Sequence, residues 1–425
     1  MVKIIRIPES TMGYDEPIND FQIIIDTPYF QRLRHIKQLD LVFEIYPGAT
    51  HTRFEHSIGT LHHERNILDR IEKNTGYIFD KEEKKTTQLA ALTHDIGHTS
   101  YSHAAEFVLM EFGEPDHDTK NVEIIKEMED DINNIPNIDF DLLLEIFERK
   151  NPLYKTIWGL VGADVLDYIT RDANRIGRSI STDTERIETY AYFDGKEYGI
   201  ETKASGSVKE HIDSYLTMYT EEYNRKAASF WKGIIRRGIY EACEQGKIKP
   251  KEVWQMTDTE LECALIHSGG VAKKAYEKIR NRNESKAFLT IKLEGMSSQE
   301  ETRGKPIRVF EMPENELMNI VSYFGESIDN VVKFERDVER ELSLEPGSAT
   351  LAEMPHLSMV KAKDVPLYNM DNGWTSLFKE INGLKEIFDM AVQRKYALRV
   401  GVSKPYRKRA FEQSDKIIEY LKSFI

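Results

Sequence analysis

The sequence predicts a mainly helical protein with one small β-hairpin and a mixed α+β C-terminal region. Through roughly the first 180 residues, apolar residues recur at the three- and four-residue spacing of amphipathic helices. The dipeptide Asp194-Gly195 separates two strand-like segments, which is a strong signal for a hairpin. After residue 285, short strand-like segments alternate with helical patterns.

The first helix is expected to begin at Asp26-Thr27-Pro28, where a capping residue precedes a proline in the first turn. The apolar residues that follow at three-residue spacing are expected in the core: Phe30, Leu33, Ile36 and Leu39. Further helices are expected over residues 52–71, 84–95, 139–148, 154–172 and 208–245, and the hairpin strands over 188–193 and 197–201.

In the C-terminal part, strands are expected over residues 288–292 and 396–402. Helices are expected over 315–323, 329–342, 374–393 and 410–424. We place the domain boundary so that residues 1–265 form the main core and residues 266–425 a mixed region with an oligomerisation or regulatory role.

Composition narrows the class of protein. A chain of 425 residues with 40% hydrophobic and 31% charged residues is ordinary for a soluble globular protein. The net charge of −14 argues against a general nucleic-acid binder, although a local basic pocket can still hold phosphates. Nucleic acid is therefore a possible but not a favoured partner.

The cysteine content and the apolar pattern predict a cytoplasmic protein without a membrane partner. Cys243 and Cys263 are the two cysteines, and they give neither a disulfide framework nor a cysteine metal motif. Residues 1–8 do not resemble a signal peptide, because this stretch is too short and polar residues follow it. No apolar run approaches the length of about 20 residues that spans a bilayer.

Histidines and acidic residues concentrate in one part of the chain. Nine of the twelve histidines fall between His35 and His117. Imidazole nitrogens and carboxylate oxygens together suit a divalent cation. A lone histidine is usually structural, and His35, His62, His63 and His211 keep that interpretation.

His94 and Asp95 are adjacent, and neighbours on a helix point about 100° apart, so both can bind one ion only near a helix end. Gly97 allows such an end. His56 on an earlier helix and Asp164 on a later one could complete the set. Two histidines and two carboxylates leave room for water, which hydrolysis requires.

Three ordered motifs carry a specific family resemblance: Arg53-Phe-Glu-His56-Ser-Ile-Gly, then His94-Asp-Ile-Gly-His-Thr-Ser-Tyr-Ser-His103, then Asp164-Val-Leu-Asp-Tyr-Ile-Thr-Arg-Asp172. Together they resemble the HD-domain metal-dependent phosphohydrolases, and within them the branch of dGTPase-like deoxynucleoside triphosphate triphosphohydrolases. Segments 26–39 and 43–47 also match that branch. The resemblance covers about residues 14 to 245 and implies an all-helical HD-domain core and a homo-oligomer.

The resemblance implies one divalent metal ion per site, whether Mn, Fe, Mg, Ni or Zn. Its ligands would be His56, His94, Asp95 and Asp164, because the family ligand is the first aspartate of its Asp-x-x-Asp-Tyr segment. Asp167 would then be a supporting acid that pairs with Arg171 four residues later.

The resemblance also implies the catalytic residues. His117 would protonate the leaving oxygen and Glu106 would orient it, with His98 and Asp95 beside them. Imidazole suits this task because it titrates near neutrality. Asp118 stands where the family usually has glutamate.

On the substrate side, the resemblance assigns residues to the sugar, the α-phosphate and the phosphate path. These residues are Gln38, Leu39, Arg53, His98, His103, Tyr168, Asp172, Tyr223 and Lys226. The segment 223–226 resembles the family's Tyr-x-His-Lys, with Arg225 replacing the histidine.

Two positions depart from the triphosphohydrolase pattern. Val165 and Tyr215 replace cations that neutralise the β- and γ-phosphates, and each lost charge-assisted contact costs about 1.5–3 kcal/mol. The leading hypothesis is hydrolysis of a dNTP to deoxynucleoside and triphosphate by attack of metal-activated water on the α-phosphate. The alternatives are the same chemistry on a nucleoside mono- or diphosphate, a modified nucleotide or a single-stranded DNA end, and a catalytically silent nucleotide-binding subunit.

Overall fold

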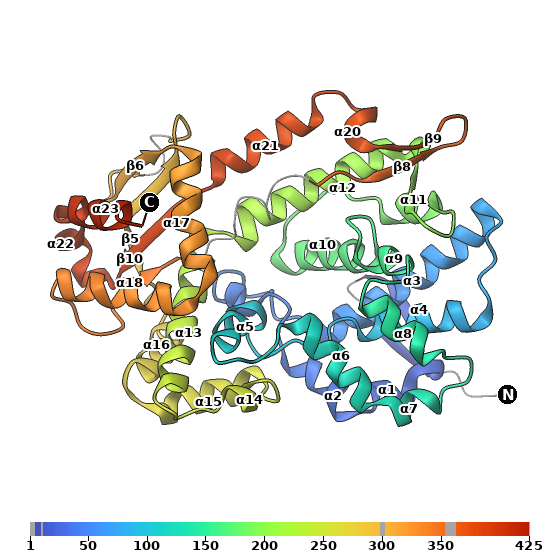
Figure 1. The fold of residues 1–425 in the computed structure, drawn as a ribbon, viewed down its shortest axis with the longest axis horizontal. Coiled ribbons are helices and arrows are strands. Elements are labelled where there is room, and N and C mark those ends of the chain that lie inside the picture. Colours follow the sequence, from blue (N-terminus) through green and yellow to red (C-terminus); the bar gives the residue numbers. More distant parts are fainter. Residues whose placement is uncertain (1–4, 10–11, 298–301, 353–362, 425) are drawn as a thin grey trace.

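Helices make up most of the protein and the strands form small sheets, as the sequence predicts (Figure 1). The computed structural model describes residues 5–9, 12–297, 302–352 and 363–424. Within these ranges there is one two-stranded sheet and two four-stranded sheets. Among the same residues, none of the helices has both the length and the apolar character needed to cross a bilayer.

Three helices form the centre of the N-terminal part. Helix α3 (Arg53–Thr75) packs against both α4 (Lys81–Thr93) and α10 (Ala163–Ile176). A capping box between Asp80 and Glu83 begins α4, and Gly76, with a φ of 72°, ends α3. These three helices carry the predicted metal ligands to one place.

The other elements up to residue 280 are a β-ribbon, the hairpin described below and a series of further helices. Strands β1 (Arg6–Glu9) and β2 (Tyr14–Pro17) pair as an antiparallel ribbon. The helices are α1 (Gln22–Ile25), α2 (Pro28–Arg32), α5 (Ser102–Glu111), α6 (His117–Glu127), α7 (Glu129–Asn133), α8 (Phe140–Phe147), α9 (Tyr154–Trp158), α11 (Thr184–Thr189), α12 (Ser205–Thr217), α13 (Lys226–Glu244), α14 (Pro250–Val253), α15 (Asp258–Ser268) and α16 (Gly270–Arg280).

The predicted hairpin is confirmed and is part of a larger sheet. Strands β3 (Ala191–Phe193) and β4 (Tyr198–Glu201) are antiparallel, and β8 (Pro366–Asn369) adds to β4 in parallel, followed by β9 (Gly373–Ser376). Residues near 370 therefore return to the N-terminal part. Helices α20 (Leu377–Glu380) and α21 (Leu384–Lys395) lead from β9 back to the C-terminal sheet (Figure 1).

The C-terminal sheet has the order β6-β5-β10-β7. Its β5 (Lys286–Leu293) runs parallel to β6 (Arg308–Met312), and β10 (Leu398–Val402) is antiparallel to both β5 and β7 (Ala349–Leu351). Helices α17 (Glu314–Glu326), α18 (Ile328–Glu341), α22 (Arg407–Glu412) and α23 (Ser414–Lys422) accompany this sheet.

Helix α13 connects the two parts, because it contacts α5 on one side and β7 and α16 on the other. The domain boundary expected at residues 265/266 stays a prediction, and that position falls within α15.

Several predicted helices are interrupted. The single helix expected over 154–172 is wrong, since α9 ends at Trp158 and α10 begins at Ala163. A Cβ on Gly162 would lie 2.5 Å from the Ile157 carbonyl oxygen, so the tight turn between them requires glycine. The helix expected over 208–245 contains a π-helical turn at Met218–Tyr223 and a break before α13.

Two C-terminal helices also differ from expectation. The segment expected as one helix over 374–393 begins with β9 and restarts after Gly383, whose φ is 79°. The segment 410–424 divides into α22 and α23. In the N-terminal stripe, Phe30, Leu33 and Ile36 are buried as expected, but Leu39 is only partly buried because α2 ends at Arg32.

Gly59 sets the close approach of α3 to α10. A Cβ at this position would lie 1.8 Å from Asp167 Oδ1 and 2.5 Å from Arg171 Nη2, and both of those side chains are fully buried. Replacing Gly59 with alanine is therefore expected to destabilise the protein by about 3 kcal/mol through overpacking. Urea unfolding measures the change.

The matched control is Gly206→Ala in α12, where nothing lies within 4 Å of the added Cβ. This variant should be as stable as the wild type or more stable by about 1 kcal/mol. A Gly59→Ala protein as stable as Gly206→Ala would contradict the packing described for α3 and α10.

Candidate metal centre and the cavity around it

His94 and Asp95 lie where α4 ends, as the sequence predicts. His94 follows the last helical residue, and Asp95 lies in the turn after it. Asn121 of α6 holds this turn, since its Oδ1 accepts from Gly97 N at 2.8 Å and its Nδ2 donates to the His94 carbonyl at 3.0 Å. A Cβ on Gly97 would lie 2.5 Å from Asn121 N, so glycine is required there.

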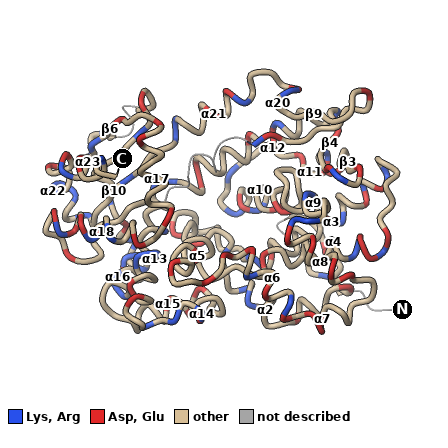
Figure 2. Tube along the Cα trace, viewed as in Figure 1, with Lys and Arg blue, Asp and Glu red and all other residues tan. Residues whose placement is uncertain are grey.

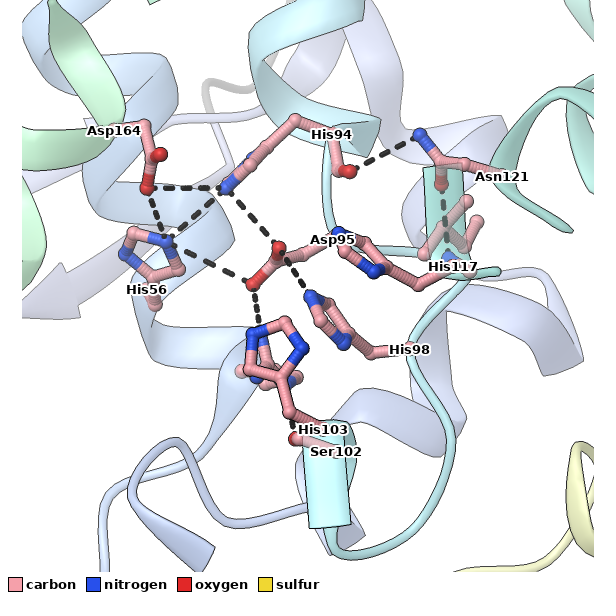
Figure 3. Close-up of polar contacts among 12 residues, drawn as sticks. His56, His94, Asp95, His98, Ser102, His103, His117, Asn121 and Asp164 are labelled. Carbon is pink, nitrogen blue, oxygen red and sulfur yellow. Dashed lines mark hydrogen bonds and ion pairs between the residues drawn. The ribbon is translucent and has the colours of Figure 1, made fainter. Parts of the chain in front are cut away.

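The four predicted metal ligands converge (Figure 3). His56 Nε2 lies 3.1 Å from His94 Nε2 and 3.1 Å from Asp164 Oδ1. Asp95 Oδ1 lies 3.4 Å from His94 Nε2. An ion about 2.1 Å from each donor would place neighbouring donors about 3 to 3.5 Å apart. The donor atoms of His56, His94 and Asp95 all lie within 4.8 Å of one another, and Asp164 lies beside the two histidines.

Hydrogen bonds orient both imidazoles. His56 Nδ1 lies 2.8 Å from Asp167 Oδ2, and His94 Nδ1 lies 2.9 Å from the Ala91 carbonyl oxygen. A proton on each Nδ1 leaves the Nε2 lone pairs directed at the shared centre. Asp167 in turn accepts from Arg171 Nε at 2.8 Å, so the pairing expected between them is confirmed.

The carboxyls of Asp95 and Asp164 are ionised. Burial acts to raise the pKa of Asp95, but Arg53 and the neighbouring histidines outweigh it and hold this pKa well below its usual range. Burial likewise opposes ionisation of Asp164, and His56 and His94 lower its pKa overall. The centre therefore presents negative charge to a cation.

A second cluster lies beside the first and is built around Glu106 of α5. Glu106 Oε1 lies 2.7 Å from His117 Nδ1 and accepts from His117 N at 2.9 Å, while Oε2 lies 2.9 Å from His103 Nδ1. The His98 ring stacks on His117 with centroids 4.2 Å apart. These four residues also lie close enough to bind a cation together, although their donor atoms already contact one another.

The stacked histidines have opposite pKa shifts. Burial lowers the pKa of His117, but Glu106 more than compensates, so this pKa is raised. Burial also lowers the pKa of His98, and Arg53 and His117 lower it further, well below its usual value. His98 is therefore neutral where His117 still holds its second proton.

Both clusters open on a cavity of about 940 Å³. Its wall includes C-terminal residues from α17, α18, β7 and β10, among them Phe324, Val331, Leu351 and Leu398. Eight of the nine predicted substrate residues lie in the wall: Gln38, Leu39, Arg53, His98, His103, Tyr168, Asp172 and Tyr223. Lys226, at the start of α13, is not among the described residues of the wall.

The cations of the wall differ from those expected. Arg225 contacts Tyr46 and Glu222 instead of lining the cavity. Basic and acidic residues are interspersed along the trace (Figure 2), and on α13 Lys232 and Arg236 line the cavity. Sequence reasoning missed this pair, although their four-residue spacing on a helix places them on one face.

Asp172 is held by two residues of the N-terminal part. Its Oδ1 lies 2.7 Å from His51 Nε2, and its Oδ2 accepts from the Tyr223 hydroxyl at 2.5 Å. The sequence did not lead us to expect this contact of His51 with Asp172. The position of His51, two residues before Arg53 in the first motif, could have indicated it.

Two family models match the chain over overlapping ranges. Residues 53–215 match the HD domain model, and residues 183–317 match the HD associated region. An uncharacterized protein of Methanocaldococcus jannaschii is 30% identical over 272 residues, which is 63% of this chain and 55% of that protein. A deoxynucleoside triphosphate triphosphohydrolase SAMHD1 homolog of Dictyostelium discoideum is 26% identical over 64% of this chain and 57% of its own length.

The chain thus spans a little over half the length of these curated relatives. Among solved structures, a phosphohydrolase from Bacteroides thetaiotaomicron matches 94% of this chain and all of its own, with a TM-score of 0.71 and 18% identity. A hypothetical protein from Aquifex aeolicus matches 97% of this chain with a TM-score of 0.69 and 20% identity. At these identities the likeness shows a shared fold.

Replacing Glu106 with glutamine tests the coupling to His117. The variant keeps an oxygen near Nδ1 but removes the charge that raises the pKa of His117, so this pKa should fall and the ring should lose its proton at lower pH. NMR titration of ¹³C-labelled histidines measures the pKa of His117. Glu123→Gln on α6, the helix that carries His117, is the control. Glu123 pairs with Lys120 at 2.9 Å, and its replacement should leave the pKa of His117 unchanged. An unshifted His117 in Glu106→Gln would contradict the coupling.

Proposed function

The chain belongs to the HD-domain phosphohydrolases, and on that premise we propose that it hydrolyses a dNTP, such as dGTP, to deoxynucleoside and triphosphate. One observation carries the proposal. His56, His94 and Asp95, whose donor atoms lie within 4.8 Å of one another, face one cavity together with Asp164, His117 and several cationic side chains. Relatives named as deoxynucleoside triphosphate triphosphohydrolases, at 25–26% identity, support the choice of substrate.

We assign His56, His94, Asp95 and Asp164 as ligands of one divalent ion. When bound, such an ion supplies Lewis-acid polarisation of a phosphate and lowers the pKa of water. Nitrogen and carboxylate donors are compatible with Mn, Fe, Mg, Ni or Zn.

His117 is the proposed general acid. Its Nδ1 is held by Glu106, so the imidazolium proton on Nε2 is the one available for transfer. As a water oxygen bonds to the α-phosphorus and gives up one proton to solvent, the bond from phosphorus to the sugar oxygen breaks, and that oxygen takes the His117 proton. Neutral His98, stacked against His117, remains a hydrogen-bonding partner for a phosphate oxygen.

Arg53 is positioned to hold the α-phosphate. Its Nε donates to Ser102 Oγ at 2.9 Å and its Nη1 pairs with Asp95, which fixes the guanidinium at the edge of the metal centre. Gln38, Leu39, Tyr168, Asp172 and Tyr223 would then lie around the sugar, and His103 along the phosphate path.

A second candidate is the same chemistry on another phosphoester, such as a nucleoside mono- or diphosphate, a modified nucleotide or a DNA end. The observation that favours it is the arrangement of cations. The expected clamp positions are Val165 and Tyr215, and the wall has Arg149, Lys232 and Arg236 instead. The expected homo-oligomer and cytoplasmic setting stay predictions.

A substrate panel distinguishes these functions. With Mn²⁺, the wild type is expected to release tripolyphosphate from a dNTP, and His94→Ala should be slower by about 1,000-fold, because the lost Lewis acid supplies several kcal/mol. The exposed His35→Ala is the control and should match the wild type.

The panel also contains NTPs, NMPs, NDPs and single-stranded DNA. Release of phosphate or nucleoside from one of these, without tripolyphosphate from any dNTP, would replace the first proposal with the second. No hydrolysis of any of these compounds would contradict both.

A further inference from the structure

Asp40 is an acidic residue of the cavity wall that the proposed mechanism does not use. It begins the short 3₁₀ segment Asp40–Glu44, directly after Gln38 and Leu39. Its residue surface is 5% exposed, and its Oδ1 has no hydrogen-bond partner. Gln38 Oε1 is likewise buried without a partner. Two neighbouring acceptors on one loop are therefore left for a ligand.

Two features of Asp40 each reduce the stability of the folded protein. Its φ of 46° lies in the left-handed region, which side chains other than glycine adopt at a cost. A buried carboxyl without a hydrogen bond carries a further cost. Strain and an unsatisfied polar group at a cavity wall are typical of a functional position.

The charges around Asp40 keep it largely ionised at neutral pH. Burial raises its pKa to about 6, and Asp258 acts in the same direction. Lys232, Arg53 and His103 face it from α13, α3 and α5 and limit that rise. An ionised carboxylate accepts hydrogen bonds and repels phosphate, so the group it meets is an uncharged donor.

Asp172, the acid that is predicted to contact the sugar, differs from Asp40 in its hydrogen-bond partners. Both carboxylate oxygens of Asp172 already have partners, His51 and Tyr223, whereas Asp40 Oδ1 has none. Each Asp172 oxygen thus already uses one of its two lone pairs, whereas both lone pairs of Asp40 Oδ1 are left for a donor.

We propose that Asp40 is a specificity-determining residue whose carboxylate accepts a hydrogen bond from an uncharged donor on the nucleoside part of the substrate. This inference rests on the proposed function and names what that site selects. The sugar 3′-hydroxyl and a base amino group share this donor chemistry, and substrate pairs that differ in one of these groups distinguish them.

The experiment compares wild type, Asp40→Asn and Asp40→Gly with Mn²⁺. The kcat/KM ratio is measured for dGTP against 2′,3′-dideoxy-GTP, which differ in the 3′-hydroxyl, and for dGTP against dITP, which differ in an amino group. In one pair, the preference for the donor-bearing substrate should fall by about tenfold or more, the range of a hydrogen bond to a charged group. The ratio of the other pair should stay unchanged.

Thermal unfolding of the same proteins gives a second readout. Asp40→Gly relieves the left-handed strain and the buried charge, so its unfolding midpoint should rise, whereas removing a merely structural residue would lower it. Asn137→Gly is the matched control, because Asn137 is exposed and also has a positive φ, of 59°. It should gain stability without any change in either ratio.

Three other results would contradict the proposed role of Asp40, and they differ in what they say about the proposed function. Ratios within twofold of the wild type in both pairs would overturn the inference and leave the proposed function intact. A lower midpoint in both Asp40 variants with unchanged ratios would make Asp40 structural. Absence of hydrolysis by the wild type would remove the proposed function, and this inference with it.

Discussion

The structure of the site depends on the contact between α3 and α10 at Gly59. Because Gly59 has no Cβ, the fully buried Asp167 can lie against α3, where it contacts both His56 and Arg171. A buried carboxylate is costly unless its oxygens are paired, and here the His56 ring N–H and the Arg171 guanidinium supply that pairing. Asp164 lies on α10 one turn earlier, so the same contact brings it to His56.

Two adjacent histidine clusters have different electrostatic character. His56 and His94 face carboxylates that stay ionised, which suits a cation. His98 and His117 are stacked on each other and have pKa values shifted in opposite directions. Environments that separate the pKa values of neighbouring groups give one of them the acid role. This difference supports the proposed division between metal binding at the first cluster and proton donation at the second.

Local patterns in the sequence predicted much of this arrangement. The order of the His and Asp motifs placed four donors together, and Gly97 indicated the helix end at His94. Local patterns did not reveal the break at Gly162, which depends on a contact with the Ile157 carbonyl. They also missed Lys232 and Asp40, since membership of a cavity wall depends on packing between elements far apart in the chain. The left-handed φ of Asp40 has no signal in a single sequence.

Anomalous diffraction from crystals soaked in Mn²⁺ tests the central claim most directly. The account predicts one strong manganese peak per chain, bounded by His56, His94, Asp95 and Asp164. A peak between His98, His103, Glu106 and His117, or no peak at either cluster, would contradict it.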